Sequence, residues 1–183
     1  MRATRNRARK NTGGVVPQLS LQNTDPSLSA TEQVLSDAIE VRLMRLVAEA
    51  EAVRATYFAE QRAAERAALD AMGRASLRSQ GNTLNRRIEL MFTRAERSLI
   101  PGMGWRTVRL RKGRPPMSTY LAKVGAPRTG AALRRNANSW ELPLALAADA
   151  RLAAIRAEAD VYVRIRRQLV TLRRLAQPDD AQP

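Results

Sequence analysis

The sequence contains neither cysteine nor histidine in its 183 residues. Without thiols there is no disulfide framework and no thiolate zinc site. Without imidazole there is no Ser-His-Asp triad, no Cys-His dyad and no imidazole metal ligand. No run of about 18 uninterrupted apolar residues occurs, so we expect no transmembrane helix. No apolar segment follows the N-terminal charges either, so we expect a cytoplasmic location and not a secreted protein.

Motifs of common enzyme classes are also missing. There is no glycine-rich phosphate loop followed by Lys-Ser/Thr, no Gly-x-Ser-x-Gly elbow and no dinucleotide fingerprint. Carboxylate pairs such as Glu49/Glu51 and Glu158/Asp160 fit solvated helix faces better than a cleft for acid–base chemistry. The sequence therefore predicts a protein that is not an enzyme, with no catalytic residue, no metal ligand and no cofactor.

Acidic residues are absent from one long segment, residues 97–140, which we call the acid-free segment. It holds ten basic residues, whereas residues 31–96 hold ten basic and ten acidic residues. Most of the formal net charge of +15 therefore lies in this segment, and residues 1–30 add an excess of four positive charges. A local field of one sign is typical of a protein that meets a polyanion.

Nearly all of the basic residues are arginine, whose planar guanidinium suits phosphate oxygens. The expected partner is nucleic acid, with DNA favoured and no sequence selectivity. The candidate phosphate-binding residues in the acid-free segment are Arg106, Arg109, Arg111, Lys112, Arg114, Lys123, Arg128, Arg134 and Arg135. The candidates in the N-terminal arm are Arg5, Arg7, Arg9 and Lys10. Aromatic side chains can stack on exposed bases or fill the core, and the candidates are Trp105, Tyr120 and Trp140.

Two long stretches, residues 31–72 and 144–177, lack both glycine and proline and carry apolar residues at helical spacing. The first predicts a helix over residues 31–78, after a possible capping box formed by Ser29 and Glu32. Its stripe is Leu35, Ile39, Leu43, Leu46, Ala50, Val53 and Tyr57. The second predicts a helix over residues 141–177. Its stripe is Ala148, Leu152, Ile155, Ala159, Tyr162, Ile165, Leu169, Leu172 and Ala176, at the spacing of a coiled coil.

The remaining segments are shorter or less regular. Residues 83–99 predict a helix with a buried face that includes Ile88, Met91 and Phe92. Residues 103–139 predict a basic loop or β-hairpin, because apolar and basic residues alternate from Trp105 to Arg111 before a Gly/Pro turn. Residues 1–28 predict a flexible basic arm, and residues 178–183 a loose tail.

These elements predict one mainly α domain over residues 29–177, a long antiparallel helical hairpin or coiled-coil-like bundle with a basic, irregular or β-hairpin insertion. The acidic start of the first helix and the basic end of the last favour antiparallel pairing, although each sign also suits its own helix dipole. With aromatic residues at 4% the core is thin, so we expect a homo-oligomer or part of a larger assembly.

The segment Ala63–Ser98 has a further pattern. An alanine-rich helix passes through Gly73-Arg74-Ala75-Ser76-Leu77 and Ser79-Gln80-Gly81-Asn82-Thr83 into Leu84-Asn85-Arg86-Arg87-Ile88. This arrangement resembles the small internal virion (ejection) proteins of short-tailed bacteriophages. The resemblance implies a protein that is packaged in the particle and associated with DNA delivery.

The leading hypothesis is therefore a non-enzymatic assembly protein, a component of a bacteriophage virion, that contacts nucleic acid through its arginine-rich segments. One alternative is a protein–protein connector whose basic segment docks onto an acidic partner. A DNA-binding regulator would need a helix-turn-helix, which the turn at Gly81 would have to supply. A ribosome-associated protein would also carry basic arms. Association with membranes is not expected.

Overall fold

The computed structural model describes residues 30–71, 86–93, 100–111 and 113–176, without the side chains of Arg111 and Ala176. The predicted N-terminal arm over residues 1–28, the turn at Gly81 and the tail over residues 178–183 lie outside these ranges. The described elements, in chain order, are a long helix, three strands, a short helix and a second long helix. None of the described helices is long and apolar enough to cross a membrane.

Helix α1 (Ala30–Ala71) lies where the sequence predicts a helix over residues 31–78. Its buried side chains fall three, four or seven residues apart and so line one face. They are Ile39, Leu43, Leu46, Ala50, Tyr57 and Gln61. The stripe extends past Tyr57 by one further turn to a polar residue, Gln61, which is 4% exposed.

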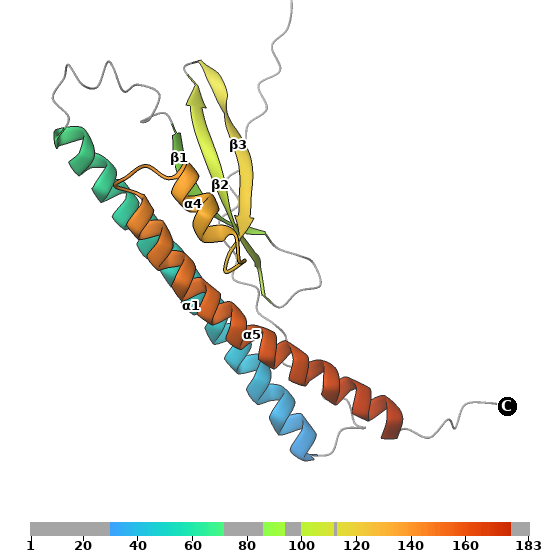
Figure 1. Cartoon of the computed structure of the whole chain (residues 1–183). Helices are drawn as coiled ribbons and strands as arrows, with labels where there is room; N and C mark the ends of the chain where they lie inside the picture. The colour runs from blue at the N-terminus through green and yellow to red at the C-terminus, as the bar shows by residue number, and fades with distance from the viewer. Residues whose placement is uncertain (1–29, 72–85, 94–99, 112, 177–183) are drawn as a thin grey trace, which may run out of the picture.

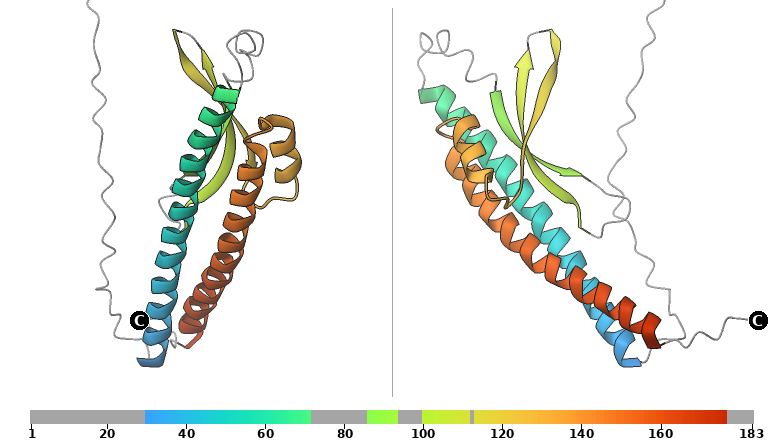
Figure 2. Two further views of the ribbon diagram at one scale, coloured as in Figure 1. Left: turned by 90° about the vertical axis from the view of Figure 1, so that its left-hand side faces the viewer. Right: turned by 45° about the vertical axis from the view of Figure 1, so that its right-hand side comes forward.

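Helix α5 (Leu142–Ala176) runs beside α1 in the opposite direction, as Figures 1 and 2 show. Its first turn contains Pro143, where the missing N–H has no intrahelical partner to lose. Its apolar residues Leu152 and Ala159 are buried against α1. The guanidinium of Arg42 on α1 also pairs with Glu158 on α5 at 2.7 Å.

Three strands form an antiparallel sheet in the order β1-β2-β3: β1 (Arg86–Thr93), β2 (Gly102–Arg111) and β3 (Arg114–Lys123). Leu90 of β1 lies opposite Trp105 of β2, and Ile88 lies opposite Thr107. Cross-strand partners share a face of the sheet. These residues and Met103 therefore point to one face, the inner face, which packs on α1, α5 and α4.

Strand β1 corrects the prediction of a helix over residues 83–99. Ile88 and Leu90 alternate with the polar residues Arg87 and Glu89, which is the two-residue period of a half-buried strand. The spacing of Ile88, Met91 and Phe92 fits a helix equally well. Pairing with β2 along all eight residues decides between the two periods, and no local signal carries that information. The helix-turn-helix at Gly81 is also excluded, because its second helix would contain β1.

Strands β2 and β3 form a β-hairpin, which is one of the two predictions for residues 103–139. Its tip contains Gly113 at a φ of 69°, a conformation that glycine adopts without strain. Pro115 and Pro116 open β3, which is an edge strand with few ladder bonds for a missing N–H to remove.

The last part of that segment is not irregular, contrary to the prediction. Residues Thr129–Asn136 form helix α4, which packs on β3 and α5. The Thr129 hydroxyl donates a hydrogen bond to the Lys123 carbonyl at 2.7 Å, and Leu133 inserts fully into the core. Gly125 makes the turn before α4 at a φ of 67°, with the Ala153 side chain close by.

The fold is therefore mixed α/β, and the prediction of a mainly α helical hairpin or coiled-coil-like bundle is wrong. The sheet and α4 cover only one half of the helical pair (Figures 1 and 2). We call this the sheet half: the sheet, α4, residues 50–71 of α1 and residues 142–155 of α5. The distal half comprises residues 30–46 of α1 and 159–176 of α5, whose own core consists of Ile39, Leu43, Leu46 and Ala159.

Candidate nucleic-acid interface

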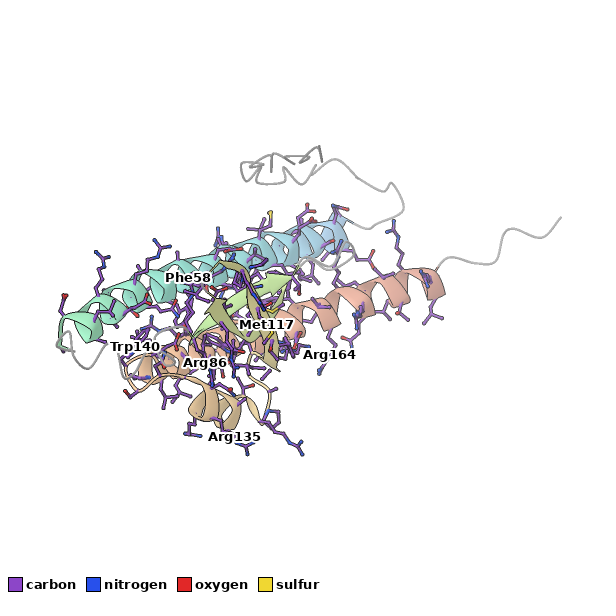
Figure 3. The ribbon with its side chains drawn as sticks, turned by 90° about the horizontal axis from the view of Figure 1, so that it is seen from above. Phe58, Arg86, Met117, Arg135, Trp140 and Arg164 are labelled. Atoms are coloured by element: carbon purple, nitrogen blue, oxygen red, sulfur yellow. The ribbon has the colours of Figure 1, made fainter. Side chains whose placement is uncertain are left out.

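Six of the predicted phosphate-binding residues have exposed side chains on the hairpin, on the following loop and on α4. In the part of the chain that the structure describes, no carboxylate lies within 4.0 Å of their cationic groups. These residues are Arg109, Arg114, Lys123, Arg128, Arg134 and Arg135. Figure 3 shows Arg135 on α4, on the side of the molecule away from α1. Their charge is therefore available to an external anion.

Arg106 differs from this group. Its guanidinium pairs with Glu89 on the neighbouring strand at 2.7 Å, and Glu89 also pairs with Arg87 at 2.9 Å. Glu89 lies outside the acid-free segment, so the local sequence gives no sign of this contact. The cross-strand register, in which Glu89 is opposite Arg106, brings the two together. Arg106 is thus partly neutralised by Glu89, and its contact with phosphate stays a prediction.

The other predicted contacts are not described at the level of side chains. Arg111 lies in β2 opposite Arg114, and only its backbone is described. Lys112 lies outside the described residues, as do the four candidates of the N-terminal arm, Arg5, Arg7, Arg9 and Lys10. Their roles remain predictions.

The three predicted stacking residues have different environments. Trp105 is 0% exposed, packs edge-on against Tyr57 with ring centroids 5.2 Å apart, and donates from Nε1 to Asp149 at 2.8 Å. It therefore belongs to the core and cannot stack on a base, because its strand position points it to the inner face. Trp140 is half-buried just before α5. Tyr120 is 57% exposed and is the one predicted stacking residue open to solvent.

An arginine that is not among the predicted phosphate-binding residues holds α4 against the sheet. Arg86, at the start of β1, donates from Nη2 to the Asn136 carbonyl and to Asn136 Oδ1, both at 2.7 Å. In return, Asn138 Nδ2 donates to the Arg86 carbonyl at 2.9 Å. These bonds fix the C-terminal end of α4, so the sheet positions Arg134 and Arg135 in its last turn. At that position both cations also offset the negative end of the helix dipole.

A buried polar cluster covers the free edge of β1 at Ile88. The Ile88 N–H donates to Glu141 Oε1 at 2.8 Å, and the Ile88 carbonyl accepts from the Tyr57 hydroxyl at 3.0 Å and from Gln61 Nε2 at 2.6 Å. Gln61 Nε2 also donates to Glu141 Oε1. Side chains of α1 and of the residue preceding α5 thus satisfy the two backbone groups of Ile88 that a fourth strand would otherwise bind.

Burial sets the ionisation of this cluster. Desolvation raises the pKa of Glu141 above its ordinary value, against the opposing effect of its hydrogen bonds from Ile88 and Gln61. Desolvation and the neighbouring Glu141 also raise the pKa of Tyr57. Both groups are enclosed in the core. The cluster therefore joins α1, β1 and α5 and offers no surface to a ligand.

No combination of described residues forms a group of three or more acidic side chains able to hold a metal ion. On the hairpin, the following loop and α4 the outward-facing chemistry is cationic: guanidinium and ammonium groups, with one exposed tyrosine beside them. Such groups bind phosphates by charge and by hydrogen bonds.

Comparison with known proteins gives one family and no individual relative. No curated protein and no solved structure matches the chain. The resemblance to phage ejection proteins stays a prediction, since no comparison bears on it, and the Arg86–Ile88 part of its motif is a strand instead of the expected helix. A family model described as MobI protein matches residues 46–170, from the middle of α1 through the whole sheet and α4 to the last turns of α5. Because this match spans more than half of the chain, the protein belongs to the MobI family.

Proposed function

We propose that the protein is a non-enzymatic accessory protein of DNA mobilization that binds nucleic acid through its hairpin and α4. One observation carries the proposal. The six exposed cations from Arg109 to Arg135 have no described carboxylate within ion-pairing distance, although the chain holds 17 acidic residues. The family, which is mobilization-related, supports a setting in which DNA is the abundant polyanion.

The expected binding is electrostatic and weakly sequence-selective. Each phosphate that a Lys or Arg neutralises releases counterions, which lowers the log of the affinity by about 0.9 per tenfold increase in salt on duplex DNA. The exposed cations project from a strand, a loop and the end of a short helix. None of these elements is shaped like a recognition helix that enters the major groove. Contacts to the phosphate backbone should therefore dominate.

The test is a salt titration by fluorescence anisotropy with a labelled DNA oligonucleotide. A variant with Arg109, Arg114, Arg134 and Arg135 changed to glutamine should bind at least tenfold more weakly at low salt, with a shallower salt dependence. The matched control changes four exposed arginines of the long helices, Arg45, Arg62, Arg66 and Arg151, to glutamine and alters the net charge equally. Absence of binding by the unaltered protein, or equal losses in both variants, would reject the proposal.

We also propose that two copies associate through their distal halves. Large apolar side chains are exposed there, including Val34 at 68%, Leu172 at 59% and Leu175 at 77%. The α1 part of this half holds three acidic residues and two arginines, and the α5 part holds five arginines and Asp160. Antiparallel docking of two distal halves would place each weakly acidic α1 part against a strongly basic α5 part and cover the apolar residues. Charge complementarity with itself makes a second copy the expected partner.

A further inference from the structure

Tyr120 lies on the outer face of the sheet, opposite to the face that contains Trp105. The register pairs Tyr120 with Arg106 across β2–β3, and pairs Arg106 with Glu89 across β1–β2. Gly104, two residues before Arg106, is paired with Lys123. Because cross-strand partners share a face, Tyr120 shares the outer face with Arg106, which lies directly across from it, and with Lys123.

A glycine makes room for the ring of Tyr120. A side-chain carbon added at Gly104 would lie 2.8 Å from Cε2 of the ring and 3.5 Å from its hydroxyl oxygen. The ring therefore extends across the backbone of Gly104, in space that any other residue would occupy. Tyr120 is nevertheless 57% exposed, so the strand covers part of the ring and the rest remains open to solvent.

This exposure is unusual within the molecule. The chain has seven aromatic residues, all of them in the described part, and the other six are buried or half-buried. Six of the seven aromatic side chains are thus fully or partly buried, and Tyr120 is the exception. An exposed aromatic face flanked by cations is the arrangement on which unpaired bases stack in proteins that bind single strands.

Of the cations on this face, Arg106 is held in place by hydrogen bonds and Lys123 is exposed to solvent. Glu89 Oε2 accepts hydrogen bonds from Arg106 Nε at 3.2 Å and Nη2 at 2.7 Å, which orients that guanidinium. Lys123 has an exposed side chain at the end of β3. On this face the cations Arg87, Arg106 and Lys123 outnumber the single carboxylate of Glu89, so the field around Tyr120 favours phosphate.

We propose that the outer face of the sheet binds single-stranded nucleic acid, with one unpaired base stacked on Tyr120 and the adjacent phosphates near Lys123 and Arg106. This inference rests on the proposed nucleic-acid-binding function. Bases in a duplex are already stacked on each other and do not present a face to a side chain, so Tyr120 contributes only where a strand is unpaired. The hairpin and α4 cations serve either form of nucleic acid, whereas Tyr120 selects the single strand.

The experiment compares single-stranded and duplex oligonucleotides of equal length at one salt concentration, by anisotropy. Tyr120→Leu should weaken single-strand binding about tenfold and leave duplex binding unchanged, because a base–aromatic stack is worth about that factor. Tyr120→Phe keeps the ring and should bind single strands as the unaltered protein does. A 2-aminopurine base in the single strand should change its fluorescence with the unaltered protein and with Tyr120→Phe, but not with Tyr120→Leu.

Each result has a definite meaning. If Tyr120→Leu binds single strands normally, or weakens both forms equally, the inference is overturned, and the loss in the four-arginine variant still supports the proposed function. If the unaltered protein binds duplex alone, the inference also fails and the function stands. If it binds neither form, both fail together.

Discussion

The two halves of the helical pair share a spacing of apolar residues but have different surroundings. Both have apolar residues at helical spacing on α1 and α5. In the sheet half that stripe meets Trp105, Leu90 and Leu133 and becomes part of a core shared by helices and strands. In the distal half, among the described residues, it packs against the other helix and Ile100, and large side chains such as Leu172 and Leu175 remain exposed. A helical stripe therefore shows where a surface will be covered, not what will cover it.

The largest expected effect separates the two halves by stability. Trp105→Ala removes the largest fully buried side chain and its bond to Asp149, and should lower the free energy of unfolding by about 3–5 kcal/mol. Leu175→Ala, at the exposed end of α5, should change it by less than about 0.5 kcal/mol. Urea unfolding followed by circular dichroism measures both. Similar losses of unfolding free energy in the two variants would contradict the difference in packing between the two halves.

A second pair of variants tests the backbone of the sheet half. Gly125 and Gly113 have nearly equal positive φ angles, 67° and 69°, but only Gly125 has a neighbour, with Ala153 Cβ 2.8 Å from an added side-chain carbon. Alanine should cost about 1–2 kcal/mol of backbone strain at Gly113. At Gly125 the contact should add about 1–3 kcal/mol. Equal urea midpoints for the two alanine variants would contradict the close packing of this turn on α5.

The third prediction concerns the pH dependence of the sheet half. Because burial raises the pKa of Glu141 in the folded protein, the folded state holds its proton more tightly than the unfolded state. The stabilisation is complete below the unfolded pKa and is lost as pH rises through the folded pKa, at about 1.4 kcal/mol per unit of difference. Glu141→Gln removes this titration, so its stability relative to the unaltered protein should increase as pH rises.

The measurement is urea unfolding between pH 5 and 8. Glu60→Gln, a change at an exposed carboxylate of α1, serves as the control and should run parallel to the unaltered protein. If Glu141→Gln runs parallel as well, the buried carboxylate does not govern the pH dependence. The distal half contains no buried acid among its described residues, so it contributes nothing comparable.

The smallest effect on folding is expected from the distal half, where the effect on association should be large. Changing Leu172 and Leu175 to serine should alter monomer stability by less than about 0.5 kcal/mol. It should convert a protein of twice the 20.3 kDa chain mass into a monomer in light scattering after size exclusion. Leu110→Ser on the hairpin is the control, since that leucine is also exposed, at 42%. A monomeric unaltered protein at high concentration would contradict self-association.

The two long helices could be predicted from the sequence because the patterns that indicate them lie within one segment of the chain. Long stretches without glycine or proline and apolar residues three or four apart predict helices where α1 and α5 lie. Strand β1 was not accessible, because Ile88, Met91 and Phe92 satisfy both periods and only the pairing with β2 resolves them. Helix α4 was missed because glycine and proline around a short segment suggest a loop, whereas burial of Leu133 stabilises the helix.

The candidate site shows the same division between local and distant information. The absence of acidic residues from 97–140 is a property of the sequence and identifies the exposed cations. The partial neutralisation of Arg106 by Glu89 depends on strand register. Trp105 is buried and Tyr120 is exposed because the two residues lie on opposite faces of the sheet. Both follow from three-dimensional pairing, which residue spacing within one segment does not encode.

The side chains that cover Ile88 at the edge of β1 have a consequence for contacts between copies of the protein. A sheet that grows from copy to copy needs free backbone groups on its edge strands. Glu141, Gln61 and Tyr57 bind the N–H and the carbonyl of Ile88 from within the same molecule, and Pro115 and Pro116 near the start of the opposite edge strand have no N–H to donate. At these positions a strand of another copy finds no free N–H donor, which disfavours edge-to-edge pairing there.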